Sequence, residues 1–282
     1  MFLEIIKFII YSLLIVVIAK YLLVRVLRSL AESLELNPKT IGNITGIATS
    51  IPELLTVIFS AITGFLNTSI FNILSSNVIN LIQYGGAIGL NKNQKYLRNK
   101  AIIIDLILCG ITILIPAAIV GFQIEVNLFF VPIFLFLAII FYKINTNSHK
   151  LYLEKEEKSI EQEELEEIQR EEKRIGTKTI VVLKYAFFLI IIGIILYFVG
   201  DKLSIALENL CNQFGVPEFV LGNLLGFATS LPELITFFES QKHYREVENK
   251  FLGVVESTNN LLTSNILNLF IIQSIGILLY LL

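Results

Sequence analysis

Cysteine and histidine are scarce in this 282-residue chain, which contains two of each. Cys109 lies inside a long apolar stretch and Cys211 lies in a predicted loop, so the two suit neither a disulfide framework nor a thiolate metal site. His149 and His243 stand apart in polar segments, where we expect both side chains to be solvated. Without clustered His or Cys residues or a soluble catalytic domain, the sequence argues against an enzyme.

Charge is also scarce, because Asp, Glu, Lys and Arg make up 16% of the residues. The net charge of −2 and the lack of a basic face give nucleic acid nothing to bind. Much of the charge falls in one block, residues 144–178, where Glu154–Lys158 and Glu166–Arg170 are helix-supporting pairs at i, i+4. A regulatory ion sensor would need a Gly-centred calcium loop, which this block lacks, so we predict a solvated helical linker in the cytoplasm.

Apolar residues make up 55% of the chain and recur in runs that are long enough to cross a bilayer, which takes about 20 residues each. The first run has no small-residue cleavage pattern and is followed directly by Arg25 and Arg28, so we interpret it as a retained span. The sequence therefore predicts an all-α, polytopic membrane protein with about eight transmembrane helices. These are expected near residues 3–24, 40–64, 69–90, 100–121, 126–143, 179–199, 217–240 and 251–281.

The loops predict the orientation of these spans. Lys and Arg gather after the first, third, fifth and seventh spans, whereas the alternate connections carry almost no positive charge. Because basic loops stay in the cytoplasm, we expect both termini outside a plasma or inner cell membrane.

One segment occurs twice, as GNITGIATSIPELLT at Gly42–Thr56 and as GNLLGFATSLPELIT at Gly222–Thr236. Each copy places an ionisable residue, Glu53 or Glu233, in a stretch that is otherwise apolar enough for lipid, at a cost of several kcal/mol unless the charge is paired, hydrated or bound to a cation. Five predicted spans separate the copies, so they are inverted in the membrane, an architecture in which sites form at the midplane. Pro52 and Pro232 predict discontinuous helices there.

The similarity continues into the next span of each half, where Ser69–Leu81 resembles Ser257–Leu269. Positions 72, 76 and 80, like 260, 264 and 268, carry Asn, Ser and Asn along one helical face. Carboxylate, amide and hydroxyl oxygens are the ligands of hard cations such as calcium and sodium.

Other polar residues in the spans have plainer interpretations. Asn43 and Asn223 suit a role in hydrogen bonds between helices and a role in ion binding equally well, because they lie beside Gly-x-x-x-Gly faces. We expect Asp105 to be structural, paired with Arg98 or reaching the interface. Glu239 and Glu256 lie toward the cytoplasmic ends of their spans, where either could line an entry vestibule, but we expect both to be solvated charges.

The paired ATSIPEL and ATSLPEL segments, each followed by a Ser-Asn-x-x-Asn element at 76–80 and 264–268, resemble the two α-repeats of the cation/calcium exchanger superfamily. The nearest branch resembles the prokaryotic sodium/calcium exchangers. The resemblance implies an antiporter with alternating access that needs no cofactor, transports calcium and sodium, and exports calcium at the expense of inward sodium. The first and sixth spans would slide as a gating pair. The cation ligands that it implies are Thr49, Ser50, Glu53, Ser76, Asn80, Thr229, Ser230, Glu233, Ser264 and Asn268.

The same resemblance divides the chain into a first inverted repeat at residues 1–143, with its α-repeat at 42–81, a charged loop at 144–178, and a second repeat at 179–282, with its α-repeat at 222–269. The family usually has ten spans, and the 14 residues after Asn268 leave no room for the last hairpin. We therefore expect either a truncated or unusual member of the family, or a partner or second copy of the chain that covers the exposed face.

The resemblance has two further departures. Ala48 and Ala228 replace the usual Gly before Thr-Ser, and both Asn80 and Asn268 are amides where sodium/calcium exchangers commonly carry one acid. Two carboxylates can be neutralised by one calcium or by two protons, so calcium/proton exchange is the main alternative. A cation channel and a non-transporting relative are the others.

Overall fold

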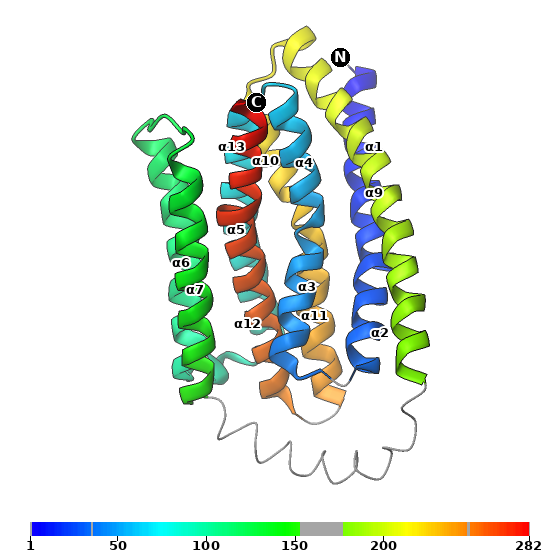
Figure 1. Ribbon diagram of the computed structural model, residues 1–282, viewed down its shortest axis with the longest axis vertical. Coiled ribbons are helices and arrows are strands. Elements are labelled where there is room, and N and C mark those ends of the chain that lie inside the picture. Colours follow the sequence, from blue (N-terminus) through cyan, green and yellow to red (C-terminus); the bar gives the residue numbers. More distant parts are fainter. Residues whose placement is uncertain (1, 35, 153–176, 247–248, 282) are drawn as a thin grey trace.

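The computed structural model describes residues 2–34, 36–152, 177–246 and 249–281, which form helices and turns without strands. Figure 1 shows the helices side by side in one bundle, with both termini at the same end. Most of the predicted linker, residues 153–176, lies outside the described residues. Seven described segments are long and apolar enough to cross a membrane: Phe2–Leu27, Pro38–Ile62, Lys100–Gly121, Phe130–Leu151, Leu183–Leu203, Glu218–Glu246 and Lys250–Leu281.

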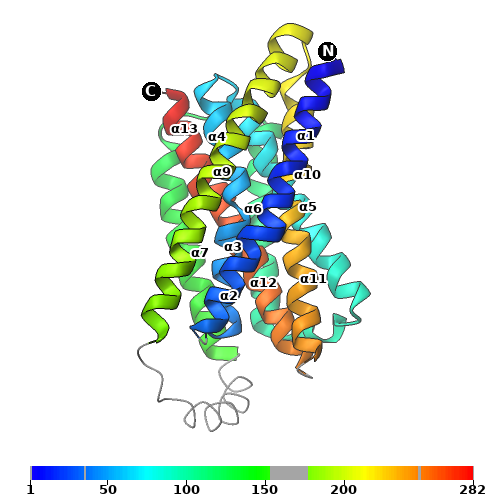
Figure 2. The same ribbon diagram turned by 90° about the vertical axis from the view of Figure 1, so that its right-hand side faces the viewer.

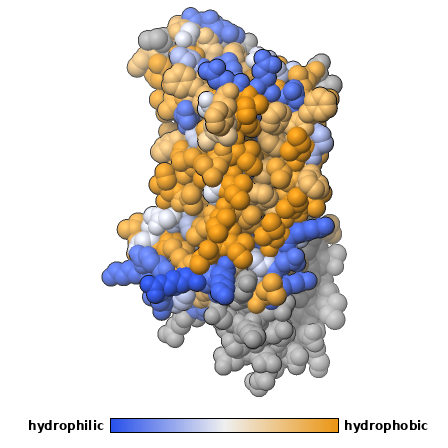
Figure 3. Space-filling model, turned by 90° about the vertical axis from the view of Figure 1, so that its left-hand side faces the viewer, coloured by the Kyte–Doolittle hydropathy of each residue, from blue (hydrophilic) through white to orange (hydrophobic). Residues whose placement is uncertain are grey.

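The surface supports a membrane location for the bundle. On the face shown in Figure 3, an apolar band crosses the middle of the molecule and hydrophilic residues gather toward its two ends. Exposed side chains such as Ile107, Leu114, Phe136 and Ile139 of the outer helices carry no polar group that water would solvate. The protein is a multi-pass membrane protein.

The third predicted span, residues 69–90, lies in helix α5 (Leu66–Leu90) but is too polar to count as a span by composition. With 25 residues it is about 37 Å long, enough to cross a bilayer. Its polar side chains, including Asn72, Ser76 and Asn80, are buried among other helices. Polar groups at membrane depth are tolerated when protein surrounds them, which explains why α5 can belong to the bundle without being apolar.

Two helices are interrupted in the middle of the bundle. Helix α3 (Pro38–Thr49) ends at Ser50 and α4 (Ile51–Ile62) continues from it, while α10 (Glu218–Thr229) and α11 (Leu231–Glu246) are divided in the same way at Ser230. Pro52 and Pro232 each stand second in the following helix, where they have no N–H to bond to the carbonyl four residues back. The predicted discontinuous helices are confirmed.

Each interrupted helix packs tightly against a helix of the other half. Helix α3 crosses α12 (Lys250–Ile266), and α10 crosses α5. A Cβ atom on Gly46 would lie 2.7 Å from the carbonyl oxygen of Asn260, and one on Gly222 would lie 2.7 Å from that of Thr68. Small residues at these crossings therefore let the backbones approach and bring the two halves together.

The outer helices flank this centre on two sides. One side holds α1 (Phe2–Ile18), π-helix η1 (Ala19–Val24), α2 (Arg25–Ser33) and α9 (Thr177–Phe214), as Figures 1 and 2 show. The other holds α6 (Lys100–Gly121) and α7 (Phe130–Tyr152), joined to α5 through the 3-10 helix η2 (Gln94–Arg98). Helix α12 continues through π-helix η3 (Leu267–Ile272) into α13 (Gln273–Leu281). Cys211 lies within α9, so its prediction as a loop residue was wrong, because α9 extends well past the predicted span.

A buried hydrogen bond between Asp105 and His149 joins α6 to α7. Nε2 of His149 lies 2.8 Å from Oδ2 of Asp105, and both side chains are buried. Asn145 donates to Oδ1 of Asp105 over 2.9 Å and to Oδ1 of Asn259 in α12 over 3.3 Å. The expectations of a solvated His149 and an Asp105–Arg98 pair were therefore wrong. Helix α7 extends past the predicted span, and its last turns bring His149 beside Asp105.

The close crossing of α3 and α12 predicts that Gly46→Ala lowers the free energy of unfolding by about 1–3 kcal/mol, since the added methyl group overlaps the Asn260 carbonyl. Gly110→Ala in α6 is the matched control, because no atom lies within 4 Å of its added Cβ. Thermal unfolding in detergent, followed with a thiol-reactive dye that reports exposure of buried Cys109, measures both. Equal midpoints for the two variants would contradict the packing argument.

Candidate cation site

Two carboxyl groups occupy the breaks in the interrupted helices. Glu53 is the third residue of α4 and Glu233 is the third residue of α11, and neither is exposed to solvent. The first turn of a helix presents unpaired N–H groups and a partial positive charge, which stabilises an anionic side chain. The last turns of α3 and α10 present the opposite, carbonyl-rich ends to the same region.

Serine hydroxyls join each carboxyl group to the other half of the chain. Ser76 Oγ in α5 donates to Glu53 Oε1 over 2.8 Å and is hydrogen-bonded to Ser230 Oγ at the break of the other half, also over 2.8 Å. The second half repeats this arrangement. Ser264 Oγ in α12 donates to Glu233 Oε1 over 3.0 Å and accepts from Ser50 Oγ over 3.0 Å.

Asparagine amides complete the connection across the centre. Asn80 Nδ2 in α5 donates to Ser264 Oγ over 3.4 Å, and Asn268 Nδ2 in η3 donates to Ser76 Oγ over 3.5 Å. Beside them, Asn77 and Asn265 donate to each other's backbone carbonyl oxygens, over 3.3 and 3.4 Å. The two inverted halves therefore meet in one reciprocal network.

The threonines at the breaks also face the opposite half. Thr49 and Thr229 bond through their hydroxyls to carbonyl groups of their own helices, Gly46 O and Leu225 O. Thr229 also contacts the Glu53 carboxyl group and Thr49 contacts that of Glu233, and the two carboxyl groups interact electrostatically with each other. The structure thus brings all ten predicted residues together, and each is at most 2% exposed.

Four further residues belong to this network and were not among the predicted ligands. Asn72 Nδ2 donates to Thr56 Oγ1 over 2.7 Å, and Asn260 Nδ2 donates to Thr236 Oγ1 over 2.6 Å. The signal for the threonines was present, since Thr56 and Thr236 are the last residues of the duplicated segment. The asparagines lie on the predicted Asn-Ser-Asn faces, one turn before the serines.

The network leaves six buried oxygen atoms without a hydrogen-bond donor in the described part of the chain. They form three repeat-related pairs: Glu53 and Glu233 Oε2, Asn72 and Asn260 Oδ1, and Asn80 and Asn268 Oδ1. A buried polar atom that lacks a partner is costly, by about 1–3 kcal/mol. Oxygen atoms of carboxylates and amides are the ligands that calcium and sodium prefer, so the unpaired atoms suit a hard cation.

No salt bridge to a lysine or arginine neutralises Glu53 or Glu233 among the residues that the structure describes. The same residues contain no group of three or more His, Cys, Asp and Glu side chains that could hold a metal ion. The centre therefore combines two acidic groups with neutral hydroxyl and amide ligands. When both carboxyl groups are ionised, one divalent cation or two monovalent cations neutralise the charge of the centre.

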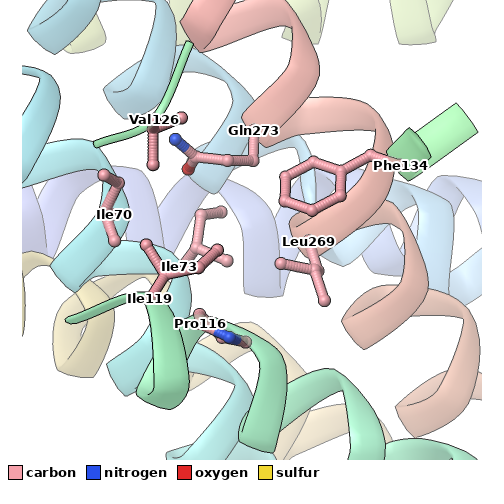
Figure 4. A pocket seen from close by; sticks show the side chains of 8 residues that line it. All are labelled: Ile70, Ile73, Pro116, Ile119, Val126, Phe134, Leu269 and Gln273. Atoms are coloured by element: carbon pink, nitrogen blue, oxygen red, sulfur yellow. The ribbon is translucent and has the colours of Figure 1, made fainter. Parts of the chain in front are cut away.

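A small pocket lies beside this network, among α5, α6, α7 and the last helices (Figure 4). Seven of its eight lining residues are apolar, and the eighth, Gln273, accepts a hydrogen bond from Ser69 over 3.2 Å. The lining lacks a carboxylate, so the pocket offers little to a cation.

Comparison with known proteins agrees with this geometry. Residues 5–149 and 184–281 match the family described as sodium/calcium exchanger protein. The chain is similar to a structure of the sodium-calcium exchanger NCX_Mj soaked with 10 mM Na+ and zero Ca2+, with a TM-score of 0.54, 21% identity and coverage of 99% of this chain and 84% of that one. For a structure soaked with 2.5 mM Na+ and 0.1 mM Ca2+, the corresponding values are 0.53, 20%, 98% and 82%. At this identity the likeness shows a shared fold. No curated protein matches the chain in sequence.

The unpaired oxygens predict that calcium stabilises the folded protein. At a concentration of about 100 times the dissociation constant, one bound ion adds about 2.7 kcal/mol to the free energy of unfolding, which raises the thermal midpoint. The double variant Glu53→Gln/Glu233→Gln is expected to lose this shift. A control that removes two exposed charges, Glu125→Gln/Glu239→Gln, is expected to keep it. An unchanged calcium shift in the first double variant would show that calcium binds elsewhere.

Proposed function

Because the chain belongs to the sodium/calcium exchanger protein family, we propose that it exports calcium from the cell in exchange for inward sodium, by alternating access. The observation that carries this proposal is the junction of Glu53 and Glu233, which come from oppositely oriented halves and share one buried network of oxygens. Members of the family are transporters of sodium and calcium, and the chain is a cation/calcium exchanger.

In this proposal the transported ion takes the place of the missing hydrogen-bond donors. Calcium is held between the carboxylates of Glu53 and Glu233, and the hydroxyl and amide oxygens around them replace its water. The proposed ligands are Thr49, Ser50, Glu53, Ser76, Asn80, Thr229, Ser230, Glu233, Ser264 and Asn268, with the free amide oxygens of Asn72 and Asn260 beside them. Sodium ions compete for the same oxygens, so the two ions exclude each other, as coupled exchange requires.

The outer pair of helices provides a moving part. Helices α1 and α9 pack on the interrupted helices through apolar side chains such as Ile15, Leu196 and Leu225. Among the described residues, one hydrogen bond connects α1 to α9, from Asn209 Nδ2 to Glu4 Oε2 over 3.2 Å. Apolar contacts have little directional preference, so this pair can slide along the bundle and expose the site to each side in turn.

Repeat boundaries and orientation complete the proposal. We assign residues 1–143 and 179–282 to the two inverted repeats and 144–178 to a cytoplasmic connection. The segment between α5 and α6, which carries the basic residues Lys92, Lys95 and Arg98, lies at the end of the bundle opposite the termini (Figure 1). From the positive-inside rule we infer that both termini lie outside the plasma or inner membrane.

Calcium/proton exchange is the second candidate, and the two amides favour it. Asn80 and Asn268 leave only two acidic groups in the centre, and two protons on Glu53 and Glu233 would balance one calcium. Both candidates use the same residues, and the driving ion distinguishes them.

Self-association belongs to this proposal, because one face of α5 is open. Ile82 in α5 is 67% exposed, whereas Phe270, which occupies the corresponding position of the second half, is fully buried against Phe134 and Phe141 of α7. We propose that a second copy of the chain covers the α5 face. Cross-linking of an Ile82→Cys variant between copies in native membranes tests this, and a protein that stays monomeric at all concentrations would contradict it.

Flux into proteoliposomes tests the function. With the purified chain, calcium movement is expected to accelerate when an opposing sodium gradient is imposed and to be indifferent to potassium and pH gradients. Glu53→Gln and Glu233→Gln are each expected to abolish exchange, because each removes half of the charge that faces a divalent ion. Glu239→Gln is the control, since Glu239 is exposed and lies outside the central network, so its loss leaves the centre intact.

Each alternative has its own outcome in this experiment. Calcium flux that follows the pH gradient and ignores sodium would establish proton coupling. Flux that never concentrates calcium against its gradient would indicate a channel, and calcium binding without flux would indicate a non-transporting relative. Near-normal exchange in either Glu→Gln variant would contradict the proposed site.

A further inference from the structure

The second half of the chain extends its line of oxygen ligands beyond the central network. Helices α11 and α12 face each other through three successive hydrogen-bonded pairs. Ser264 and Glu233 are joined over 3.0 Å, and Asn260 and Thr236 over 2.6 Å. The third pair, one turn further, is Ser240 and Glu256, in which the Ser240 hydroxyl donates to Glu256 Oε1.

Glu256 therefore stands on the ligand-bearing face of α12. It is four residues before Asn260 and eight before Ser264, so each step along the face is about 6 Å. Its side chain and those of Ser240 and Asn260 are all fully buried. The expectation that Glu256 is a solvated charge at the end of a span was wrong, because α11 packs over it where Gly253 of α12 lies against Ser240 and Gln241.

An independent observation points to a ligand at this place. The Asn260 side chain donates to Thr236 through its nitrogen, but its Oδ1 atom has no donor and is buried one turn from the Glu256 carboxyl group. A buried amide oxygen without a donor among the described residues, on the same helical face as a buried carboxyl group, suits a hard cation as a ligand.

The first half has a comparable row of hydrogen-bonded pairs, which runs toward the opposite end of the bundle. There the pairs are Ser76 with Glu53 and Asn72 with Thr56, and Thr68 occupies the position of Glu256. Thr68 in turn bonds to a carboxylate, since Glu218 Oε2 accepts from its backbone nitrogen over 3.0 Å and from its hydroxyl over 3.3 Å. Each line of oxygens thus ends in one acidic side chain, although the acid comes from a different helix in each half.

We propose that Glu256 forms an outer calcium-binding position between the facing sides of α11 and α12. Ions would pass along these sides between the central carboxylates and the end of the bundle that carries the basic loops. This inference depends on the proposed function and adds a residue that the duplicated motif does not contain. The Glu256 carboxylate attracts a divalent ion between α11 and α12. The amide oxygen of Asn260, one helical turn nearer to Glu233, then binds the ion on its way to the centre.

Sided transport kinetics test the inference. Calcium exchange by the full chain is measured in right-side-out and inside-out vesicles, with calcium supplied from one end at a time. Glu256→Gln is expected to raise the KM for calcium about tenfold at the α11–α12 end and to leave the KM at the other end unchanged. The maximal rate in the opposite direction falls correspondingly, because the exchange equilibrium itself is unaltered. The calcium-induced thermal shift is retained, since the central site is intact.

Three comparisons make the test specific. Glu256→Asp keeps the charge and is expected to keep a KM close to that of the unmodified protein, and Glu239→Gln removes a neighbouring exposed charge without effect. Ser240→Ala removes the hydrogen bond alone, so a KM shift as large as that of Glu256→Gln would assign Glu256 a purely structural role and overturn the inference.

The remaining outcomes are equally decisive. Unchanged KM values at both ends in Glu256→Gln, or an equal increase at both ends, overturn the inference while exchange by the unmodified protein leaves the proposed function standing. Lack of exchange by the unmodified protein overturns the proposed function itself, and the inference falls with it.

Discussion

The burial of two carboxyl groups, one from each half, in a single hydrogen-bonded network is the constraint around which this molecule is organised. Glu53 and Glu233 interact electrostatically at the centre of an apolar bundle, and no described salt bridge to a lysine or arginine compensates them. Such a pair is tolerable only if helix termini, hydroxyl donors and a passing cation share the charge between them. The interrupted helices supply the termini, and the serines of α5 and α12 supply the hydroxyl donors. In the proposed function, the transported ion is the cation.

The glycine crossings serve the same end. Gly46 and Gly222 bring backbone against backbone, so each half places its serine and asparagine side chains within reach of the carboxylate and the serine at the break in the other half. Close packing of the central helices holds these side chains in register, and in the proposed function the apolar packing of α1 and α9 lets that pair of helices move. The polarity of α5, which keeps it from resembling a span by composition, follows from its position in the centre.

Much of this centre was predictable because duplication gives every important position a second copy. The duplicated segments and the matching Asn-Ser-Asn faces carry the family resemblance that implied all ten residues, and the structure gathers these residues. What has no copy was not predictable. Asp105 and His149 are 44 residues apart and meet only because α7 ends over α6, and Glu256 is matched by a threonine in the first half. Single polar residues at the ends of apolar runs look solvated, and burial by a neighbouring helix is a tertiary effect that local pattern does not encode.

The exchange of hydrogen bonds between Asn77 and Asn265 has a consequence for substitutions at these two positions. Each side-chain amide donates to the main-chain carbonyl of the other residue, so the two positions lie at the pseudo-twofold axis that relates the halves. Loss of either amide removes a hydrogen bond from a side chain of one half to a main-chain carbonyl of the other, so a substitution at either position changes a contact that both halves share.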